Sequence, residues 1–591
     1  MCSSNYDKSP CVTVKYPRQC VWRGWGKIAE RLNEAVREHG SPRTVLAVEC
    51  YTGVKDEEIL PNLMHALSPT LVIDVAQAMK SPDRIETMVA PYLGDDPVFG
   101  KLTYLELEDF FEAEHLAEMR RCIESAREGL ILVYGVGATL AATKADILVY
   151  ADLARWEAQL RFRRDEISNI GVASCTVNAA KQYKRAFFVD WRVCDKHKTA
   201  LIDRWDFLLD TNTQGDPKLA TGDAVRTGLR QTARQPFRVV PYFDSAPWGG
   251  QWMKRVFDLD PDVDNYGWCF DCVPEENSLR LRFDDVTIEL PAIDLVFFQP
   301  RELLGDAVHA RFGTEFPIRF DFLDTMGGGN LSFQVHPLTE YIQRHFGMHY
   351  TQDESYYMLD AGDDSCVYLG IQEGIDPREM ASDLYAAQRG EKPFPDEKYV
   401  NRWRAKKHDH FLIPAGTCHC SGKNGMVLEI SATPYIFTFK MWDWGRMGLD
   451  GNPRPIHLSH GLANMQWDRT TQWVRDNLVN RIIPIGSGPG WTAERTGLHK
   501  REFIETHRHW FTDRTPHDTH DGVNVLNLVE GEAAVVESPD DGFEPFLVHY
   551  AETFIVPAAV GGYSIRPYGD SKSKKYATIK ALIRTEARAN G

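Results

Sequence analysis

The sequence contains no long hydrophobic run. A helix that crosses a lipid bilayer needs about eighteen or more consecutive apolar residues, and no apolar stretch in this chain of 591 residues approaches that length. The first ten residues also have no apolar core of the kind that marks a secretory signal. We therefore expect a soluble cytoplasmic protein that does not have a membrane as a partner.

Positive charge is also scarce. The chain has 67 lysine and arginine residues against 84 aspartate and glutamate residues, which gives a formal net charge of -17. An acidic protein repels nucleic acids and anionic lipids, so we expect no nucleic acid as a partner. Twelve cysteines in so long a chain do not make a disulfide scaffold.

Length and composition predict several globular domains. Hydrophobic residues make up 43% of the chain and charged residues 26%, which is typical of folded rather than disordered proteins. A chain of this length has room for roughly three to five domains, each able to bury a core of its own.

The first two hundred or so residues alternate apolar runs with charged segments of helical period. The apolar runs are residues 44–48, 70–73, 130–134, 147–150 and 187–189. The charged segments include residues 108–126 and 153–164. Continuous apolar strands between helices predict a parallel α/β sheet. Residues 211–236 are polar and predict a connector to the next part of the chain.

The order of these pieces resembles the uridine kinase branch of the P-loop nucleoside kinases. The resemblance rests on residues 133–138 and 146–152, followed by a basic helix that ends at Arg164. The phosphate loop is missing, because residues 50–56 stand where G-x-x-x-x-G-K-[ST] would lie. Without its glycines and its Lys-Ser/Thr pair, the loop cannot wrap phosphates or contact Mg²⁺.

The resemblance therefore implies a degenerate, noncatalytic kinase-like domain over residues 1–235, with a nucleotide as a possible ligand. Lys55 is followed by Asp56 and is a poor substitute for the phosphate-binding lysine. An active kinase is the alternative interpretation.

Four residues on successive strand-like runs have the side chains of a mononuclear metal site. Gln334 and His336 lie two apart in an apolar run, so their side chains leave the same face of a sheet. Glu354 opens another apolar run, and His419 follows a Pro-Ala-Gly-Thr turn. Two imidazoles and two oxygen donors suit Zn²⁺, and other divalent ions accept similar donors. Strand polar residues and hydrogen-bonded histidines without a metal are the alternative interpretation.

At these residues the chain resembles the type I mannose-6-phosphate isomerases, which are zinc enzymes built on the cupin β-barrel. The match includes the Gln-x-His-Pro motif at residues 334–337. Further similar positions are Trp248-Gly-Gly250, residues 316–324, Glu429, Arg446 and residues 453–457. The resemblance covers about residues 240–470, and it implies a cupin (jelly-roll) fold there.

The resemblance implies an aldose-ketose isomerase. Such an enzyme moves a proton between C1 and C2 of a sugar through an enediolate, whose negative charge a metal ion stabilises. Gln334, His336, Glu354 and His419 would be the metal ligands. The catalytic candidates are Glu429 for proton transfer, with Arg446 and Lys440 for charge stabilisation. The substrate-binding candidates are Trp248, Ser332, Asp321 and Gln352.

Three of these positions depart from the family pattern. Gln352 and Asp321 stand where the family usually has lysines, and Lys440 replaces an arginine. The loss of two cations and the gain of a carboxylate weaken the field that attracts a phosphorylated sugar. The sequence therefore supports metal binding more strongly than specificity for mannose 6-phosphate.

The chain beyond residue 475 predicts another β-rich domain. Residues 523–529, 533–536 and 553–558 are short strand-like runs separated by turn signals, a spacing typical of a sandwich or barrel. This part resembles the C-terminal cupin-like domain of the same isomerases, which has no metal. We expect its histidines to lie in a surface loop rather than at a second site. They are His507, His509, His517 and His520.

Together these observations predict a multidomain α/β plus all-β protein. The expected domains are residues 1–235, residues 236–474 with a polar helical insertion, and residues 475–591. The predicted function is a metal-dependent isomerase of a hexose or hexose phosphate. One alternative is a noncatalytic sugar- or nucleotide-sensing protein, and another is a bifunctional sugar kinase and isomerase.

Overall fold

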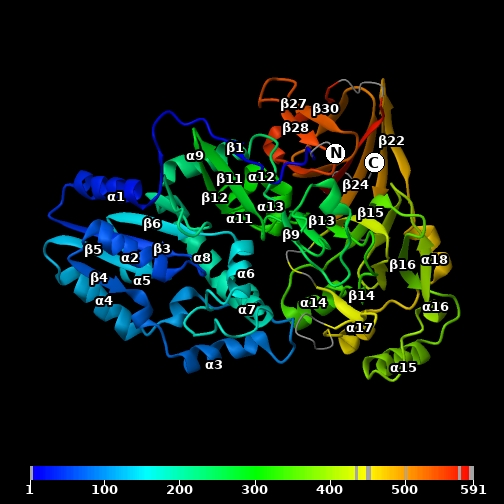
Figure 1. Cartoon of the computed structure of the whole chain (residues 1–591), viewed down its shortest axis with the longest axis horizontal. Helices are drawn as coiled ribbons and strands as arrows, with labels where there is room; N and C mark the ends of the chain where they lie inside the picture. Colours follow the sequence, from blue (N-terminus) through cyan, green and yellow to red (C-terminus); the bar gives the residue numbers. More distant parts are fainter. Residues whose placement is uncertain are drawn as a thin grey trace. The chain divides into compact units, whose positions relative to one another are not determined.

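The computed structural model describes residues 4–432, 435, 437–447, 454–497, 499–500, 502–569 and 574–584. The chain folds as two compact units. The α/β unit consists of residues 11–232 and 275–299, and the β-rich unit consists of residues 1–10, 233–274 and 300–591. Figure 1 labels their elements. Among the described residues, no helix is both long and apolar enough to cross a membrane.

A seven-stranded sheet forms the core of the α/β unit (Figure 1, blue and cyan). Its order is β2-β8-β7-β6-β3-β5-β4, in which the five strands from β7 to β4 run parallel. The strands are β2 (Val21–Arg23), β3 (Arg43–Cys50), β4 (Leu71–Asp74), β5 (Gly129–Gly135), β6 (Ile147–Asp152), β7 (Phe207–Asp210) and β8 (Lys218–Thr221). The predicted parallel α/β sheet is confirmed.

Helices alternate with these strands, as the charged segments predicted. They are α1 (Trp25–His39), α2 (Asp56–Leu67), α3 (Pro82–Leu93), α4 (Ala113–Ser125), α5 (Ala138–Ala141), α6 (Arg155–Arg163), α7 (Ala179–Arg185), α8 (Trp191–Leu201) and α9 (Gly222–Thr232). α1 shows the amphipathic principle, because its buried residues Ile28 and Leu32 are four apart and share one face.

Two predictions for this unit are wrong. The apolar run 187–189 is not a strand but lies in the π-helical segment Ala186–Asp190, between α7 and α8. Every residue of that segment is buried, and a short apolar run does not distinguish a buried helix from a strand. Residues 211–236 are not a connector either, because they contain β8 and α9.

A segment from the middle of the sequence also belongs to the α/β unit. β11 (Ser278–Phe283) and β12 (Val286–Pro291) form a hairpin, and β1 (Val12–Thr13) pairs in parallel with β11. α11 (Ile293–Phe298) follows this hairpin. The chain therefore leaves the β-rich unit after residue 274 and returns to it at residue 300.

Two antiparallel sheets form the first part of the β-rich unit. Their orders are β18-β15-β20-β13-β10-β9 and β17-β16-β19-β14-β21. The first sheet comprises β9 (Tyr242–Asp244), β10 (Trp268–Cys272), β13 (Arg319–Asp324), β15 (Glu354–Ala361), β18 (His410–Ile413) and β20 (Gly425–Ser431). The second comprises β14 (Phe333–Val335), β16 (Cys366–Ile371), β17 (Val400–Arg404), β19 (His419–Ser421) and β21 (Phe439–Trp442).

Helices flank these sheets. The predicted helical insertion over residues 378–407 is present only in part, as α15 and α16, because residues 400–404 form β17. The helices are α10 (Trp252–Val256), α12 (Pro300–Leu304), α13 (Asp306–Phe312), α14 (Thr339–Phe346), α15 (Pro377–Gln388), α16 (Asp396–Tyr399), α17 (Leu458–Asn464) and α18 (Thr471–Asn477). α15 begins where it does because Asp376 caps the amide of Arg378 and Pro377 occupies the first turn.

Two further sheets form the C-terminal sandwich. Their orders are β22-β23-β24-β31-β26-β29 and β25-β30-β27-β28. The strands are β22 (Ile483–Gly488), β23 (Trp491–Gly497), β24 (Ile504–Phe511), β25 (Thr515–Asp518), β26 (Asn524–Glu530), β27 (Ala533–Glu537), β28 (Phe546–His549), β29 (Thr553–Val556), β30 (Gly562–Pro567) and β31 (Tyr576–Ile583). The predicted run of short strands is confirmed.

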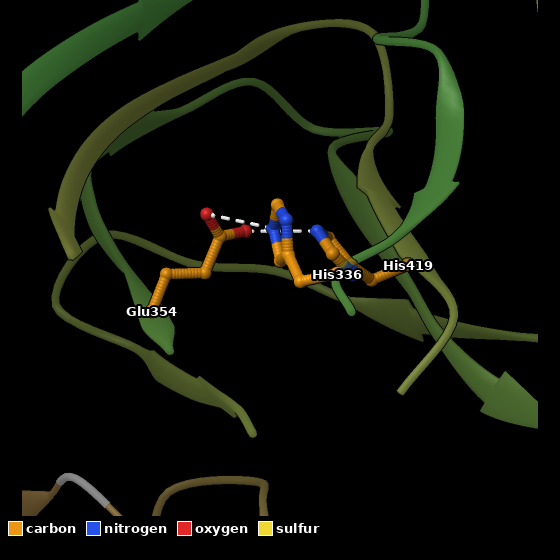
Figure 2. Close-up of side chains that lie close together, drawn as sticks. All are labelled: His336, Glu354 and His419. Carbon is orange, nitrogen blue, oxygen red and sulfur yellow. Dashed lines mark ion pairs between the residues drawn. The ribbon is translucent and has the colours of Figure 1, made fainter. Parts of the chain in front are cut away.

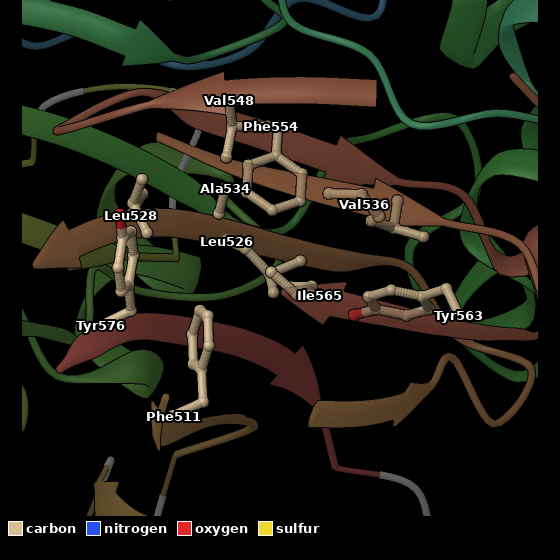
Figure 3. Packing of buried hydrophobic residues seen from close by; sticks show 11 residues of the cluster. Phe511, Leu526, Leu528, Ala534, Val536, Val548, Phe554, Tyr563, Ile565 and Tyr576 are labelled. Atoms are coloured by element: carbon tan, nitrogen blue, oxygen red, sulfur yellow. The ribbon is translucent and has the colours of Figure 1, made fainter. Parts of the chain in front are cut away.

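The core of the C-terminal sandwich draws on both of its sheets (Figure 3). Leu526 and Leu528 point inward from β26, whereas Val536 and Ile565 come from β27 and β30. Each large apolar side chain buried in this way contributes about 1.5–3 kcal/mol to folding. The sandwich is therefore held together by contacts between its two sheets.

Candidate metal centre

The four predicted metal ligands come from both sheets of the first part of the β-rich unit. Gln334 on β14 stands directly opposite His419 on β19. His336 follows β14 by one residue, and Glu354 is the first residue of β15 in the other sheet. Two-residue spacing puts Gln334 and His336 on one face, as predicted. The strands thus direct all four side chains toward the space between the two sheets.

The carboxylate of Glu354 faces the two neighbouring imidazoles and forms an ion pair with each of them (Figure 2). Its Oε1 is 2.8 Å from His419 Nε2, and its Oε2 is 3.1 Å from His336 Nε2. The amide of Gln334 lies 3.2 Å from His419 Nε2. His336, Glu354 and His419 are the one set of three or more potential metal ligands that converge among the described residues. All three are buried.

Backbone carbonyls orient the two imidazoles. His336 Nδ1 lies 2.7 Å from the carbonyl of Phe437, and His419 Nδ1 lies 2.9 Å from that of Thr417. An imidazole that donates from Nδ1 presents the lone pair of Nε2, and metal-binding histidines are commonly fixed in this way. Burial alone would raise the pKa of Glu354, but the two imidazoles hold it well below its usual range.

The donor set fits a divalent metal ion. His336 Nε2 and Glu354 Oε1 are buried and approach only other members of the cluster, without a well-formed hydrogen bond among the described residues. Buried polar atoms in this condition cost free energy unless another group satisfies them. Two imidazoles, a carboxylate and the oxygen of an amide are suitable for Zn²⁺. Gln334 would bind through Oε1, which requires only that its amide be turned over.

Glu429 lies beside this cluster and is linked to it by Gln352. Gln352 Nε2 donates to Glu354 Oε2 at 2.9 Å and is 3.4 Å from Glu429 Oε1. Burial, reinforced by the negative charges of Glu354 and Asp321, raises the pKa of Glu429 well above its usual range. A carboxyl group in this condition holds a proton more readily than an exposed one and can both donate and accept it.

Asp321 also lies beside Glu429. It stands directly opposite Glu429 on β13, and its Oδ2 accepts a hydrogen bond from Arg319 Nη2 at 2.8 Å. Burial raises the pKa of Asp321 to about 6, although Arg319 opposes the rise. Arg319 was not singled out in the sequence analysis, because its role depends on Asp321, its neighbour two residues along the strand.

A second group of charges surrounds Asp443. Arg446 Nη2 and Arg454 Nη1 lie 2.5 Å and 2.6 Å from its two carboxylate oxygens, and Ser332 donates to Oδ1 at 2.8 Å. Burial, followed by the charge of Arg454, lowers the pKa of Lys440 to about 8. Lys440 also stands opposite the ligand Gln334 on the neighbouring strand. The predicted residues Ser332, Arg446 and Lys440 are therefore close together.

Neither Asp443 nor Arg454 was named as a candidate site residue from the sequence. Arg454 belongs to the segment 453–457 that resembles the isomerases, but Pro453 lies outside the described residues. Neither residue has a local pattern that would mark it, because an ion pair between positions eleven apart leaves no periodic signal in the sequence.

Trp248 has a supporting position at the edge of this group. It is buried, and its ring centroid lies 6.3 Å from that of Trp268. Its carbonyl accepts a hydrogen bond from the amide of Gly329. The next residue is Asn330, whose carbonyl accepts a hydrogen bond from Arg446 Nη1. Trp248 thus holds the loop that positions Arg446.

The prediction for the C-terminal histidines is wrong for three of the four. His507 and His509 lie on β24, and His517 lies on β25. His509 and His517 are buried, whereas His520 is exposed. Strand placement was missed because threonine, aspartate and proline around these residues are typical of loops.

The sequence of the α/β unit matches one family model. The family is described as a domain of unknown function (DUF8485), and the match covers residues 24–234.

The β-rich unit is similar to curated isomerases. The mannose-6-phosphate isomerase of Streptococcus mutans serotype c (strain ATCC 700610 / UA159) is 25% identical over 217 residues, which are 36% of this chain and 63% of that enzyme. The mannose-6-phosphate isomerase ManA of Bacillus subtilis (strain 168) is 28% identical over 150 residues, which are 25% of this chain and 44% of ManA. The chain therefore spans less than two thirds of the length of either relative.

Solved structures of such isomerases also match. The mannose 6-phosphate isomerase from Bacillus subtilis has a TM-score of 0.47 and 17% identity, covering 59% of this chain and 99% of that chain. A zinc-bound mannose 6-phosphate isomerase has a TM-score of 0.45 and 16% identity, covering 59% of this chain and 100% of that chain.

Proposed function

We propose that the β-rich unit is a metal-dependent isomerase that interconverts an aldose and a ketose. The observation that carries the proposal is the convergence of His336, Glu354 and His419, with Glu429 joined to Glu354 through the amide of Gln352. A set of metal ligands beside a carboxyl group of raised pKa is the combination that proton transfer next to a carbonyl requires. The similarity to mannose-6-phosphate isomerases over 217 residues supports the same reaction class.

His336, Glu354 and His419 would hold the metal, and Gln334 would supply a fourth donor. When bound, a divalent ion polarises the oxygens of a sugar and stabilises the negative charge of an enediolate. The donor set supports Zn²⁺ first, and other divalent ions accept the same nitrogen and oxygen ligands.

Glu429 would carry the proton. Its carboxylate would take the proton from C2 of the aldose to give the enediolate. The hydroxyl proton on O2 passes to O1, and the acid form of Glu429 would return its proton to C1 to form the ketose. The raised pKa of Glu429 makes the acid form accessible, and this arises from burial and from the charges of Glu354 and Asp321. Gln352 orients the carboxyl group by its contact with Oε1.

The substrate class that fits best is a hexose or a hexose carrying an anionic group such as phosphate. Lys440, Arg446 and Arg454 supply three cations around the single carboxylate of Asp443. A net positive cluster of this kind binds phosphate through charge-assisted hydrogen bonds. This cluster is next to the candidate metal ligand Gln334, because Lys440 on β21 stands opposite Gln334 on the neighbouring strand β14.

The test is conversion of a panel of aldoses by the full-length protein loaded with zinc. The panel contains mannose, glucose and their 6-phosphates, and the readout is the ketose product. We expect the wild type to produce a ketose from at least one sugar of the panel. The His419→Ala variant should lose both this activity and the bound zinc. No ketose from any member at full zinc occupancy would overturn the isomerase and favour the noncatalytic sugar-sensing alternative.

We propose that the chain is divided into domains at residues 1–235, 236–474 and 475–591. We also propose that the first of these, which contains most of the α/β unit, is a degenerate kinase-like domain. β3 lies between β5 and β6, so its carboxyl end marks the point where ligands bind in open α/β sheets. Most of the loop that follows β3, residues 51–55, is buried. Lys55 in this loop forms an ion pair with Glu166 at 2.8 Å and donates a hydrogen bond to Gln214. A nucleotide phosphate would have to displace these contacts.

This second proposal is tested by nucleotide binding. The full-length protein is mixed with a fluorescent ATP analogue and Mg²⁺, and we expect no saturable binding. Saturable binding accompanied by transfer of the γ-phosphate to a sugar would instead establish the bifunctional kinase and isomerase.

A further inference from the structure

Two buried histidines face each other inside the C-terminal sandwich, away from the metal centre described above. His509 on β24 and His517 on β25 come from different sheets, and their ring centroids are 4.3 Å apart. Only 6% of the surface of His509 and 7% of that of His517 is exposed. Tyr563, whose inward position Figure 3 shows, stacks on His517 at 5.0 Å and fixes the plane of that ring.

The nitrogens of this histidine pair have unmet bonding capacity. His517 Nδ1, His517 Nε2 and His509 Nδ1 are buried and have no hydrogen-bond partner among the described residues. Buried polar groups are almost always paired, so three unpaired nitrogens on two touching rings indicate a missing partner.

The size of the missing partner is restricted by packing. The unpaired nitrogens have almost no surface that a water molecule can touch, which leaves no room for a phosphate or a sugar. A metal ion bonds to imidazole nitrogen at about 2.0–2.1 Å and needs no space of water size. The predicted metal ligand His336 is comparable, because its buried Nε2 approaches only another candidate ligand, Glu354, and its ring lies 4.9 Å from that of His419.

A third imidazole stands next to this pair. His507 precedes His509 by two residues on β24 and therefore projects from the same face of the strand. Its Nε2 lies 2.5 Å from Oε1 of Glu505, whose other oxygen is bound by Arg584. A carboxylate that fixes one nitrogen of an imidazole is a frequent outer partner of a metal-binding histidine.

We propose that His509 and His517, completed by His507, bind a second divalent transition-metal ion such as Zn²⁺ or Cu²⁺. This site is independent of the proposed isomerase and lies in a domain that the resemblance assigns no metal. Binding is weaker here than at His336, Glu354 and His419, because only that first cluster already brings three ligand atoms together among the described residues. Lys580, which stands opposite His507 on β31, adds a repelling charge.

The test is metal stoichiometry of the full-length protein. Zinc is removed by dialysis against a chelator and returned in steps against a chromophoric competitor. The wild type is expected to bind two equivalents per chain, one tightly and one more weakly. His336→Ala should remove the tight equivalent alone, whereas His509→Gln and His517→Gln should each remove the weak one and leave the tight one and any isomerase turnover unchanged.

Two further variants sharpen the result. Lys580→Met removes the repelling charge and should raise the affinity for the weakly bound zinc at least about tenfold. If the site instead binds an anion, the same substitution should weaken binding of that anion. His349→Gln, at an exposed histidine, is the matched control and should change neither equivalent. Thermal unfolding in the presence of chelator checks that each variant folds.

A single equivalent in the wild type would overturn the proposal, and this readout does not depend on the folding of any variant. A second equivalent that persists in both His509→Gln and His517→Gln would overturn it as well. Replacement of zinc by Co²⁺ gives a further readout, since the visible absorption of the weak equivalent should report nitrogen ligands in the wild type and disappear with His517→Gln.

Discussion

Asp321 stands directly opposite Glu429 on the neighbouring strands β13 and β20, and both carboxyl groups are buried. Arg319 contacts Asp321 at 2.8 Å and its charge also opposes the rise in the pKa of Glu429, but it is one cation beside two carboxyl groups. Burial, reinforced by the charges of Glu354 and Asp321, raises the pKa of Glu429. The pairing thus gives Glu429 the proton affinity that a general acid and base needs.

Glu429→Gln should abolish most of the isomerase activity without loss of the metal. The amide keeps the size of the side chain but cannot shuttle a proton, so kcat should fall by about 10²–10⁴-fold. Zinc content and kcat are measured on the same preparation. Glu373→Gln, an exposed control, should leave both unchanged, and near-normal kcat in Glu429→Gln would assign the proton transfer to another group.

Gln352→Lys should shift the acid limb of the pH profile of kcat/KM to lower pH. Gln352 contacts both Glu354 and Glu429, so an ammonium group there favours the ionised form of Glu429 and lowers its pKa. The base form then persists to lower pH, and the limb should move down by about one pH unit or more. Gln352→Met, which adds no charge, should not move the limb in that direction; an unmoved limb in Gln352→Lys would show that Glu429 does not set it.

Arg454→Met should discriminate between phosphorylated and free sugars. Arg454 and Arg446 both contact Asp443, and loss of one cation from a phosphate anchor should raise KM for a hexose phosphate by about tenfold or more. KM for the free hexose should change little. Arg404→Met, at an exposed arginine on β17, is the control and should change neither KM. An equal rise in KM for both sugars in Arg454→Met would show that Arg454 does not bind the phosphate.

Lys198→Met should destabilise the α/β unit strongly. Lys198 Nζ lies 2.7 Å from Asp152 and 2.9 Å from Asp294, and all three side chains are buried. Removal of the lysine leaves two buried carboxylates without their partner, which should cost about 3–5 kcal/mol in the free energy of unfolding. Urea unfolding followed by tryptophan fluorescence measures the change.

A lysine on the same helix provides the control for that experiment. Lys196 is two residues away on α8 and pairs with Glu106 at the surface, so Lys196→Met should change the free energy of unfolding by no more than about 1 kcal/mol. Equal effects of the two substitutions would mean that the buried ion cluster does not stabilise the unit.

The convergence of His336, Glu354 and His419 at the candidate metal centre could be predicted because its signals are local. Gln334 and His336 are two apart in one strand, and Glu354 and His419 each begin an apolar run. Strand alternation then fixes which side chains share a face. The parallel sheet was predictable for the same reason, since continuous apolar runs mark strands buried on both faces.

The remaining features depend on contacts between distant parts of the chain. Residues 275–299 leave the β-rich unit, and Asp294 reaches Lys198 across 96 positions. The facing of His509 and His517 depends on the pairing of β24 and β25 with different neighbours. Such pairings follow from packing rather than local pattern, so propensity alone does not find them.

The most direct test of the isomerase is exchange of the sugar proton with solvent. Deuterium incorporated at C1 and C2 from deuterated water is measured on a substrate of the panel, while zinc is returned stepwise to the metal-free protein. We predict that exchange rises in proportion to occupancy of the site at His336, Glu354 and His419, and that His336→Ala shows none. Exchange that is equal in the metal-free protein and at full occupancy would contradict the proposed function.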